Sequence, residues 1–429
     1  MEYYNKKNGL IAALTLCFGT SAWAGQYVDV GIIVGTEYTD NATRSEDGDT
    51  SERQDRYGLT LASDYENQLL DLDVSYSAQE RRFSEDSQPT RSYVEGDFDL
   101  LLGKPHHFAD LLLSHSRRSA LRQPDQIDLL VNRDERDIYS AIPTLRARLT
   151  PVNQVMLQGH YSQIKYRFDD NRDSERAGGS LIWQHTSSAT TEWRVVGSHT
   201  EVSFDLNPQL DYTYQAGTIA YSVALSRLSY TVEVGYNETE TEQDETFSSP
   251  TARVEANYDT GRHRFSLIAR QFITDSSQAG GNLGEPGSFG SGRDTVGQMD
   301  QLERRSADIR WDYSGLCQRC DVSVSAFYRY DDYRTLEEDT DEVGLGAGMG
   351  YRLTERASTH LNLTARRQSF EAASDRETFE LGRARLSYRY SFPNDLSLEL
   401  FTHYEKRHSS AITQRYDEAR AGLTLGFVF

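Results

Sequence analysis

The chain has 429 residues, with 66 Asp and Glu against 45 Lys and Arg, so its formal net charge is −21. No run of about 18 apolar residues occurs, which excludes a membrane-spanning α-helix. The acidic balance argues against nucleic acid as a partner, because neutralising phosphates requires basic patches. The 26 Tyr and 17 Phe are spread along the whole length, which argues against a disordered chain.

The N-terminal segment has the features of an export signal. Lys6 and Lys7 precede the apolar stretch Leu10–Phe18, and Ala22–Ala24 has the A-x-A form of a signal peptidase site. We therefore expect residues 1–24 to be a cleaved signal peptide. The remainder, residues 25–429, is expected to form one domain.

Export places the mature chain in an oxidising compartment, where cysteines pair. Cys317 and Cys320 are the two cysteines of the mature chain. A CxxC pair is also found in redox-active sites, but here no βαβ pattern surrounds it. The spacing therefore favours a small structural disulfide in a turn.

From Tyr27 onward the sequence alternates apolar and polar residues with a period of two. Leu70–Tyr76 alternates Leu and Val with Asp and Ser, and Val343–Leu353 alternates apolar residues with glycines. This period is typical of strands with one dry and one wet face. About 20 such segments can be counted, with 18 or 16 as alternatives, because the alternation is blurred around Asp205–Leu225 and Asp244–Asp259.

The connections between these segments alternate in length. Short turns such as Glu66-Asn67 and Thr260–Arg262 come between longer polar connections such as Asn41–Gln54 and Asp275–Met299. A soluble sandwich has no reason to place all short turns at one end, whereas a transmembrane barrel has short periplasmic turns and long external loops. The pattern predicts an all-β, transmembrane, antiparallel up-and-down β-barrel of about 20 strands with both termini periplasmic.

The last strand points to the compartment. Leu423, Leu425, Phe427 and Phe429 alternate with Thr424, Gly426 and Val428 up to the terminal aromatic residue. This ending resembles the assembly signal of bacterial outer-membrane barrels. It implies the cell outer membrane of a Gram-negative bacterium, with outer-membrane lipid, lipopolysaccharide and the barrel-assembly machinery as partners.

The wet face of the strands carries charges of both signs. About 20 strands enclose more space than side chains fill, which predicts a water-filled lumen. The charges are either solvated residues paired across neighbouring strands or a surface that selects anionic solutes. The candidate lumen-lining residues are Asp71, Asp73, Asp97, Asp99, Arg253, Glu255, Arg270, Asp308, Arg310, Asp312, Arg366, Arg383, Arg385 and Arg389.

Two long connections are candidates for narrowing that lumen. Ser276–Arg293 is rich in Gly and Ser, and it is expected either to fold inward as a constriction or to lie outside. Ser119–Arg136 carries an apolar patch that is unfavourable in water, so it is expected to fold into the lumen or to dock on a partner. The apolar residues of the patch are Ile127, Leu129, Leu130 and Val131.

No nucleophile motif, metal-ligand cluster or Gly-rich phosphate loop is recognisable in the sequence. We therefore expect no enzymatic activity, no catalytic residue, no metal and no cofactor. The remaining possibilities are transport and structure.

The first hairpin carries a family resemblance. Gly35–Asn41, followed by an acidic loop and then Tyr57–Leu61 and Tyr65–Asn67, resembles the β-barrel porin 2 family, most strongly over residues 26–83. Some members of that family are encoded with exopolysaccharide synthesis and export machinery. The resemblance implies an outer-membrane porin-like channel for exopolysaccharide export, with polysaccharide-export components as partners. The alternatives are a general or solute-specific uptake porin and a structural or adhesive surface barrel with a blocked lumen.

Overall fold

In the computed structural model the chain forms one sheet of 20 strands. The structure describes residues 27–48, 50–104, 107–122, 127–241, 245–278, 300–336, 339–371 and 376–429, so the expected signal peptide lies outside the described residues. The strands are β1 (Tyr27–Thr39), β2 (Glu52–Glu66), β3 (Leu70–Phe83), β4 (Arg91–Leu102), β5 (Ala109–Leu121), β6 (Arg133–Thr150), β7 (Asn153–Tyr166), β8 (Ser174–Ser188), β9 (Thr191–Phe204), β10 (Tyr212–Ala224), β11 (Leu228–Thr241), β12 (Thr246–Asp259), β13 (His263–Asp275), β14 (Gln301–Tyr313), β15 (Cys320–Tyr333), β16 (Thr340–Arg352), β17 (Ala357–Glu371), β18 (Arg376–Ser391), β19 (Leu396–Ser409) and β20 (Tyr416–Val428).

Short 3₁₀ turns occur only in the connections and at strand ends of the described chain. They are η1 (Leu130–Asn132), η2 (Asp170–Arg172), η3 (Pro208–Leu210), η4 (Ser276–Gln278) and η5 (Ile412–Gln414). No helix in these ranges is long and apolar enough to cross a membrane.

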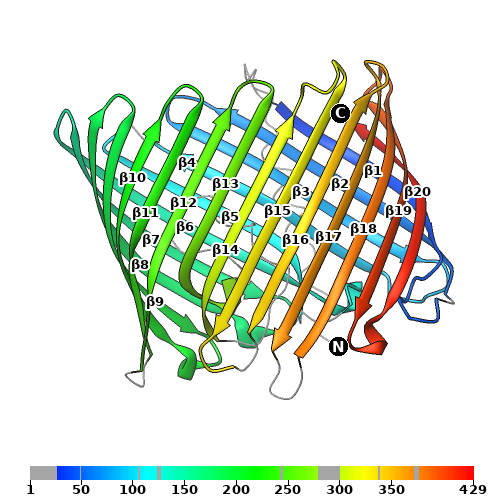
Figure 1. Ribbon diagram of the computed structural model, residues 1–429, viewed down its shortest axis with the longest axis horizontal. Coiled ribbons are helices and arrows are strands. Elements are labelled where there is room, and N and C mark those ends of the chain that lie inside the picture. Colours follow the sequence, from blue (N-terminus) through cyan, green and yellow to red (C-terminus); the bar gives the residue numbers. More distant parts are fainter. Residues whose placement is uncertain are drawn as a thin grey trace, which may run out of the picture.

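Every strand pairs antiparallel with the next one along the chain, and β20 pairs antiparallel with β1 (Figure 1). This last pairing runs from Gly31 opposite Val428 to Thr39 opposite Arg420, so the sheet closes on itself and leaves no free edge. The fold prediction is confirmed, including the strand count of twenty. The two blurred segments contain β10 and β12.

The barrel has two unlike ends. Connections such as residues 67–69 and 151–152 lie at one end, which we call the short-turn end, and connections such as residues 84–90 and 167–173 lie at the other, the long-loop end. β1 begins and β20 ends at the short-turn end. Cys317 and Cys320 form a disulfide in the turn between β14 and β15, also at the short-turn end.

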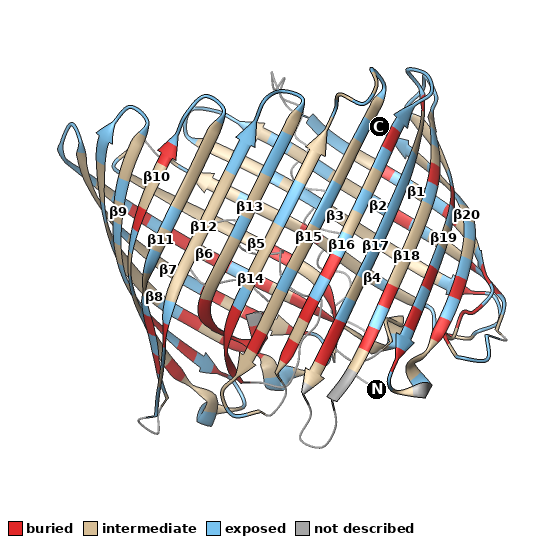
Figure 2. Ribbon diagram, in the orientation of Figure 1, coloured by how far each residue is buried: buried red, intermediate tan, exposed pale blue. Residues whose placement is uncertain are grey.

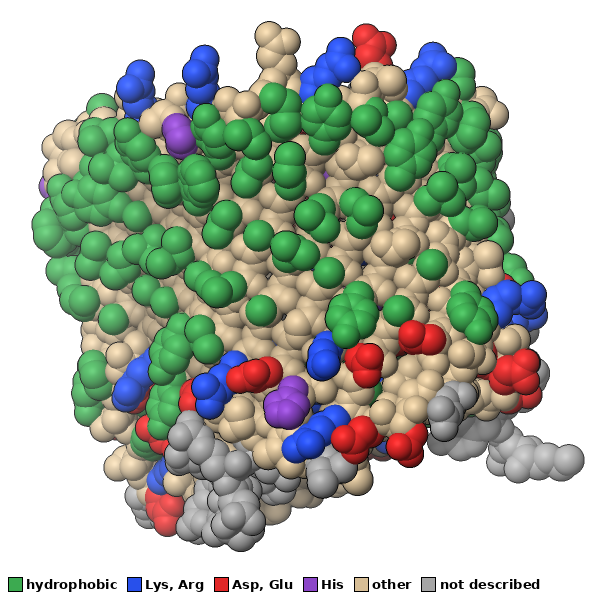
Figure 3. Space-filling model, turned by 45° about the vertical axis from the view of Figure 1, so that its right-hand side comes forward, with side chains coloured by type: hydrophobic (Ala, Val, Ile, Leu, Met, Phe, Trp, Pro, Cys, Tyr) green, Lys and Arg blue, Asp and Glu red, His purple; other side chains and the backbone are tan. Residues whose placement is uncertain are grey.

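The outer face of the barrel is an apolar belt. On β16 the outward side chains are Val343, Leu345, Met349 and Tyr351, which are 39–61% exposed although they are apolar or aromatic. Figure 3 shows such side chains as a broad band, with charged residues above and below it. A surface of this kind is stable in a lipid bilayer, where a closed barrel satisfies every backbone hydrogen bond internally.

Aromatic side chains mark both borders of the belt. Tyr38, Tyr57 and Tyr161 are exposed towards the long-loop end, and Trp183 and Trp193 are exposed towards the short-turn end. Aromatic rings with a polar tip are favoured at membrane–water interfaces. The distance between the two borders therefore corresponds to the part of the barrel that lipid surrounds.

On the inner face of β16 the alternate positions are glycines, and Gly344 has a clear steric reason. A Cβ atom at this position would overlap the ring of Phe327, which lies opposite it on β15. The glycine therefore lets an aromatic side chain lie flat against the inner wall.

Burial is uneven along the barrel axis. Buried residues gather towards the long-loop end, whereas the opposite half of the wall is mostly intermediate or exposed (Figure 2). Apolar inner-face residues such as Ile164, Tyr166, Phe204 and Tyr212 are 1–6% exposed there. The long-loop half of the lumen is therefore partly filled, and the short-turn half is more open.

Candidate functional site in the barrel lumen

The strand alternation places all of the candidate lumen residues on the face opposite the apolar belt. Most of the arginines among them contact carboxylates on the same or a neighbouring strand. Arg383 donates to Glu405 at 2.7 Å, and Arg385 and Arg389 both donate to Glu399, at 2.7 and 2.9 Å. These residues lie on β18 and β19, whose register brings Arg383 opposite Glu405 and Arg389 opposite Glu399.

A second paired group lies on β12 and β13. Glu255 accepts hydrogen bonds from Arg253 at 2.7 Å and from Arg270 at 3.1 Å. The three side chains line a cavity of about 690 Å³ against the inner wall of β6 to β13. On β14, Arg310 pairs with Asp312 at 2.9 Å.

The remaining candidates have mixed surroundings. Arg366 forms an ion pair with Glu342 at 3.4 Å. Asp97 accepts a hydrogen bond from Arg118 at 2.5 Å, and Asp71 lies 3.9 Å from Lys104. Asp308 lies opposite Ile268 and Phe327 on the neighbouring strands.

The inner wall of β2, β3 and β4 carries two rows of three like charges, in which each residue lies directly opposite the next. Near the short-turn end, Asp73 lies opposite Asp64 on one side and opposite Asp99 on the other. Towards the long-loop end, the same three strands carry Arg56, Arg81 and Arg91 in one row. Asp73 and Asp99 of the first row are among the residues predicted from the sequence to line the lumen, whereas the three arginines of the second row are not.

The end of the β13–β14 hairpin bends into the lumen. Asp275 accepts hydrogen bonds from Arg176 at 2.6 Å and from Tyr212 at 2.5 Å, and both donors belong to the inner wall, on β8 and β10. Tyr166 of β7 donates to the carbonyl of Ser277 at 2.7 Å. The side chains of Arg176 and Asp275 are 0% and 3% exposed, so this contact is fully enclosed.

The predicted constriction Ser276–Arg293 is thus described only over Ser276–Gln278, and the rest lies outside the described residues. The part that is described lies inside the barrel, packed against the wall formed by β7, β8 and β10. The strands around it contribute the apolar cluster of Val202, Phe204 and Tyr212.

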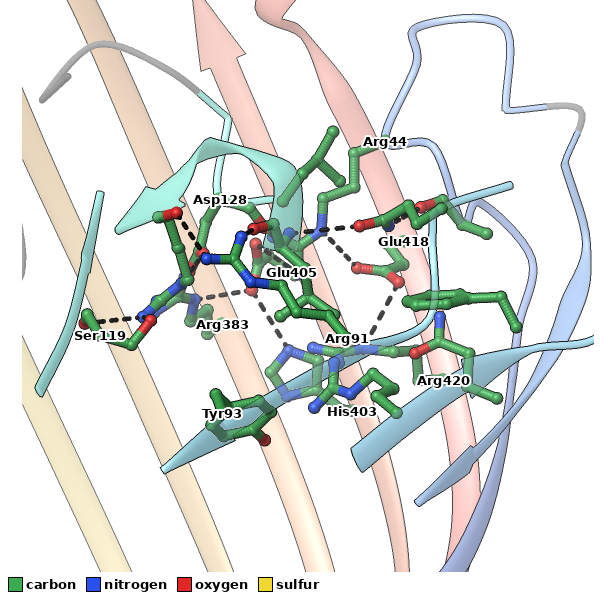
Figure 4. A pocket seen from close by; sticks show the side chains of 18 of the residues that line it. Arg44, Arg91, Tyr93, Ser119, Asp128, Arg383, His403, Glu405, Glu418 and Arg420 are labelled. Carbon is green, nitrogen blue, oxygen red and sulfur yellow. Dashed lines mark hydrogen bonds and ion pairs between the residues drawn. The ribbon is translucent and has the colours of Figure 1, made fainter. Parts of the chain in front are cut away.

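A second inward segment comes from the β1–β2 and β5–β6 connections. Arg44 donates to the carbonyl of Asp128 at 2.6 Å and to Glu418 of β20 at 3.0 Å, so the two loops meet each other and the wall (Figure 4). Leu129 and Leu130 line a cavity inside the barrel. The apolar patch of Ser119–Arg136 therefore folds into the lumen, which is one of the two outcomes expected from the sequence.

The residues around Asp128 keep its side chain ionised. It accepts two hydrogen bonds from Arg133, at 2.6 and 2.9 Å. Burial acts to raise the pKa of Asp128, but these hydrogen bonds and the positive charges of Arg133, Arg44 and Arg383 outweigh it and lower the pKa to about 2. The loop contact is therefore ionic throughout the physiological pH range.

The cavity beside these loops measures about 380 Å³. In Figure 4, Arg91 and Tyr93 on β4 face Arg383, His403 and Glu405 on β18 and β19. Its lining includes six arginines and four carboxylates. No group of three His, Cys, Asp or Glu in the described ranges is arranged to hold a metal ion.

The fold and lumen define the class of protein: a transmembrane β-barrel with a polar, partly filled interior. The sequence matches no family model and no curated protein. The resemblance to the β-barrel porin 2 family therefore rests on the hairpin residues alone.

Solved structures with a similar chain course are outer-membrane proteins. OpdK from Pseudomonas aeruginosa is 11% identical over 94% of this chain and 99% of that chain, with a TM-score of 0.40. OmpTdeltaL8 from Vibrio cholerae is 10% identical over 94% and 99%, with a TM-score of 0.37. The FrpB iron transporter from Neisseria meningitidis is 9% identical over 94% and 82%, with a TM-score of 0.45. Similarity at this level carries no information about solute or mechanism.

Proposed function

We propose that this protein is an outer-membrane channel through which small hydrophilic solutes diffuse. The observation that carries the proposal is a closed barrel of 20 strands with an apolar outer belt and a charged inner wall that encloses cavities. Barrels of this size hold water unless they are plugged. Charged side chains on the inner wall need either an ion-pair partner or water, and the exposed ones, such as Arg310 and Arg389, require water around them.

The location in the outer membrane is part of the proposal. It is supported by the expected signal peptide, by the all-antiparallel closed barrel and by the final strand, in which Phe427 and Phe429 are 39% and 62% exposed. A β-barrel in this membrane faces lipopolysaccharide and is inserted by the barrel-assembly machinery. Both are proposed partners.

The inward segments favour small solutes over a polymer. Asp275–Gln278 and the loop around Arg44 and Asp128 lie inside the barrel and are held by buried ionic contacts. A polysaccharide chain needs a wider path than a small solute does, and these segments occupy part of the lumen. Export, with polysaccharide-export components as partners, is supported only by the family resemblance, so we place uptake of small solutes first.

Planar-bilayer recording of the purified barrel tests the proposal. We expect stable conductance steps and partial current block by small polyethylene glycols but not by large ones. The same preparation after heat denaturation is the control. A folded barrel that gives no steps would overturn the channel proposal and favour a structural surface barrel, and free passage of polymer-sized probes would favour export.

A further inference from the structure

The starting point is the row of three arginines on neighbouring strands of the inner wall. Arg81 on β3 lies directly opposite Arg56 on β2 and directly opposite Arg91 on β4. The Cβ atoms of directly opposed residues lie about 5 Å apart, and like charges in such pairs destabilise a sheet. All three side chains are half-buried, so water screens their repulsion only in part.

These arginines have no carboxylate partner among the described residues. Arg56 donates to the hydroxyl of Thr424 at 3.0 Å. Arg91 donates to the backbone carbonyls of Leu130 and Arg133, and its guanidinium also lies over the ring of Phe168. Arg81 forms no hydrogen bond or ion pair with any described residue. The middle guanidinium, which has a like charge on each side, is thus the least compensated.

The cavity of about 380 Å³ lies against this row, since Arg81 and Arg91 both line it. Other arginines of the lining pair with three of its four carboxylates, and the fourth, Glu95, accepts a hydrogen bond from the backbone N–H of Ser119. Arg44 binds Glu418 and lies near Glu405, Arg133 binds Asp128, and Arg383 binds Glu405. Arg81 and Arg91 therefore form no ion pair with any carboxylate of the cavity wall, where six arginines face four carboxylates.

We infer that this cavity is a binding site for a small solute that carries a carboxylate or a phosphate group. A guanidinium presents a planar, bidentate donor that matches both groups. The volume is within the range of small-ligand sites. Tyr93 and Phe83 line the same cavity and give the solute an apolar surface beside the charged one. The inference rests on the proposed function, because it assigns the solute class of the same lumen.

The experiment uses the full-length barrel in planar bilayers, with D-glucuronate or inorganic phosphate added from the long-loop side. D-glucose is the neutral probe that matches glucuronate in size. We expect glucuronate or phosphate to block the current at concentrations at which glucose has no effect. In Arg81→Gln the blocking concentration should rise about tenfold, which corresponds to the loss of one charge-assisted hydrogen bond. The probe with the lower blocking concentration identifies the source as carboxylate or phosphate.

Arg310→Gln is the matched control. It removes the same charge from the inner wall, but Arg310 is paired with Asp312 and does not line this cavity. Its blocking concentration should stay within about twofold of that of the natural protein, because a distant charge is screened by salt. Arg81→Lys, which keeps the charge and loses the bidentate geometry, should give an intermediate value.

Two results would overturn the anion-binding site without affecting the channel proposal. One is an equal change of blocking concentration in Arg81→Gln and Arg310→Gln, and the other is equal current block by glucose and glucuronate. If no conductance is seen at all, calorimetric titration of the detergent-solubilised barrel with the same probes separates the two proposals. If the barrel binds the probes and Arg81→Gln weakens this binding, the anion-binding site is supported and the channel proposal is rejected. Absence of binding would reject both.

Discussion

Arginines on two parts of the lumen wall have opposite surroundings. On β18 and β19, Arg383 and Arg385 each contact a glutamate of the neighbouring strand, at 2.7 Å in both cases. On β2, β3 and β4, Arg56, Arg81 and Arg91 lie opposite one another instead. Both groups point into the same lumen, so the difference comes from register and not from location.

The comparison shows which charges stabilise the barrel and which do not. A paired arginine holds two strands together and satisfies a carboxylate. An arginine that lies opposite another arginine and has no carboxylate partner costs stability, and the anionic solute inferred above would offset that cost. The sequence left open whether the inner-face charges pair with one another or select anions. In the structure Arg366, Arg383, Arg385 and Arg389 all have carboxylate partners.

The largest effect is expected at the buried carboxylate of the paired wall. Glu405 is 1% exposed and accepts hydrogen bonds from Arg383 at 2.7 Å and from Tyr416 at 2.5 Å. Glu405→Gln leaves Arg383 and Arg44 without this charge and should cost about 3–5 kcal/mol of unfolding free energy, measured by denaturant titration in detergent. Glu399→Gln, in a more exposed pair, should cost about 1 kcal/mol or less. Equal losses of unfolding free energy in the two variants would mean that burial does not determine how much these ion pairs contribute to stability.

A loss of about 3 kcal/mol is expected for Arg176→Met, because Asp275 is then buried without a counter-charge. The end of the β13–β14 hairpin should leave the wall, so conductance in planar bilayers should rise. The double variant Arg176→Met with Asp275→Asn removes the buried charge and should recover much of the stability. Unchanged conductance in the single variant would show that this segment does not narrow the path.

A smaller, pH-dependent effect on conductance is expected when the carboxylate of Asp128 is protonated. The pKa of Asp128 is lowered to about 2, against about 3.9 for an ordinary aspartate. Its ionic contact with Arg133 therefore stabilises the inward loop fully above pH 4 and is lost as the pH falls towards 2. Conductance of the natural protein should change over this range, and Asp128→Asn should show the altered conductance already at pH 7. If Asp128→Asn still shows the full change of conductance at acid pH, groups other than Asp128 cause that change.

The smallest effect on the unfolding free energy is expected in the row of Arg56, Arg81 and Arg91. The sign of this effect is the sharpest test of the comparison. Arg81→Gln removes two like-charge contacts and should leave the unfolding free energy unchanged or raise it by about 0.5 kcal/mol. Arg383→Gln makes the same chemical change on the paired wall and should lower it. A clear loss of stability in Arg81→Gln would show that Arg81 has a structural role, which the described contacts do not reveal.

Much of the fold was predictable because each strand has two different environments. Apolar residues must face lipid and charged residues must face water, so the period-two alternation marks each strand. The alternating lengths of the connections gave closure and the even strand count. Segments such as Asp205–Leu225 were harder to assign, because inner-face residues such as Tyr212, Tyr214 and Ala220 are apolar or aromatic and blur the alternation.

The candidate site was predictable only in part. The short turn after Glu66 fixes the β2–β3 register, so the pairing of Arg56 with Arg81 was in principle readable from the sequence. The pairing of Arg81 with Arg91 was not, because the β3–β4 connection is longer and allows several registers. Arg44 and Asp275 were missed because the residues that form ion pairs with them lie more than 80 residues away, on other parts of the wall.

The sequence by itself determined that the chain is an antiparallel barrel with a lipid-facing belt and a charged interior, because side-chain period and connection length are local properties. The tertiary structure decided which charges meet. Ion pairing depends on strand register, on barrel closure and on loops that fold back into the lumen, and each of these brings together residues that are distant in the chain. Only the closed barrel therefore distinguishes the arginines that hold the wall together from those left free to bind a solute.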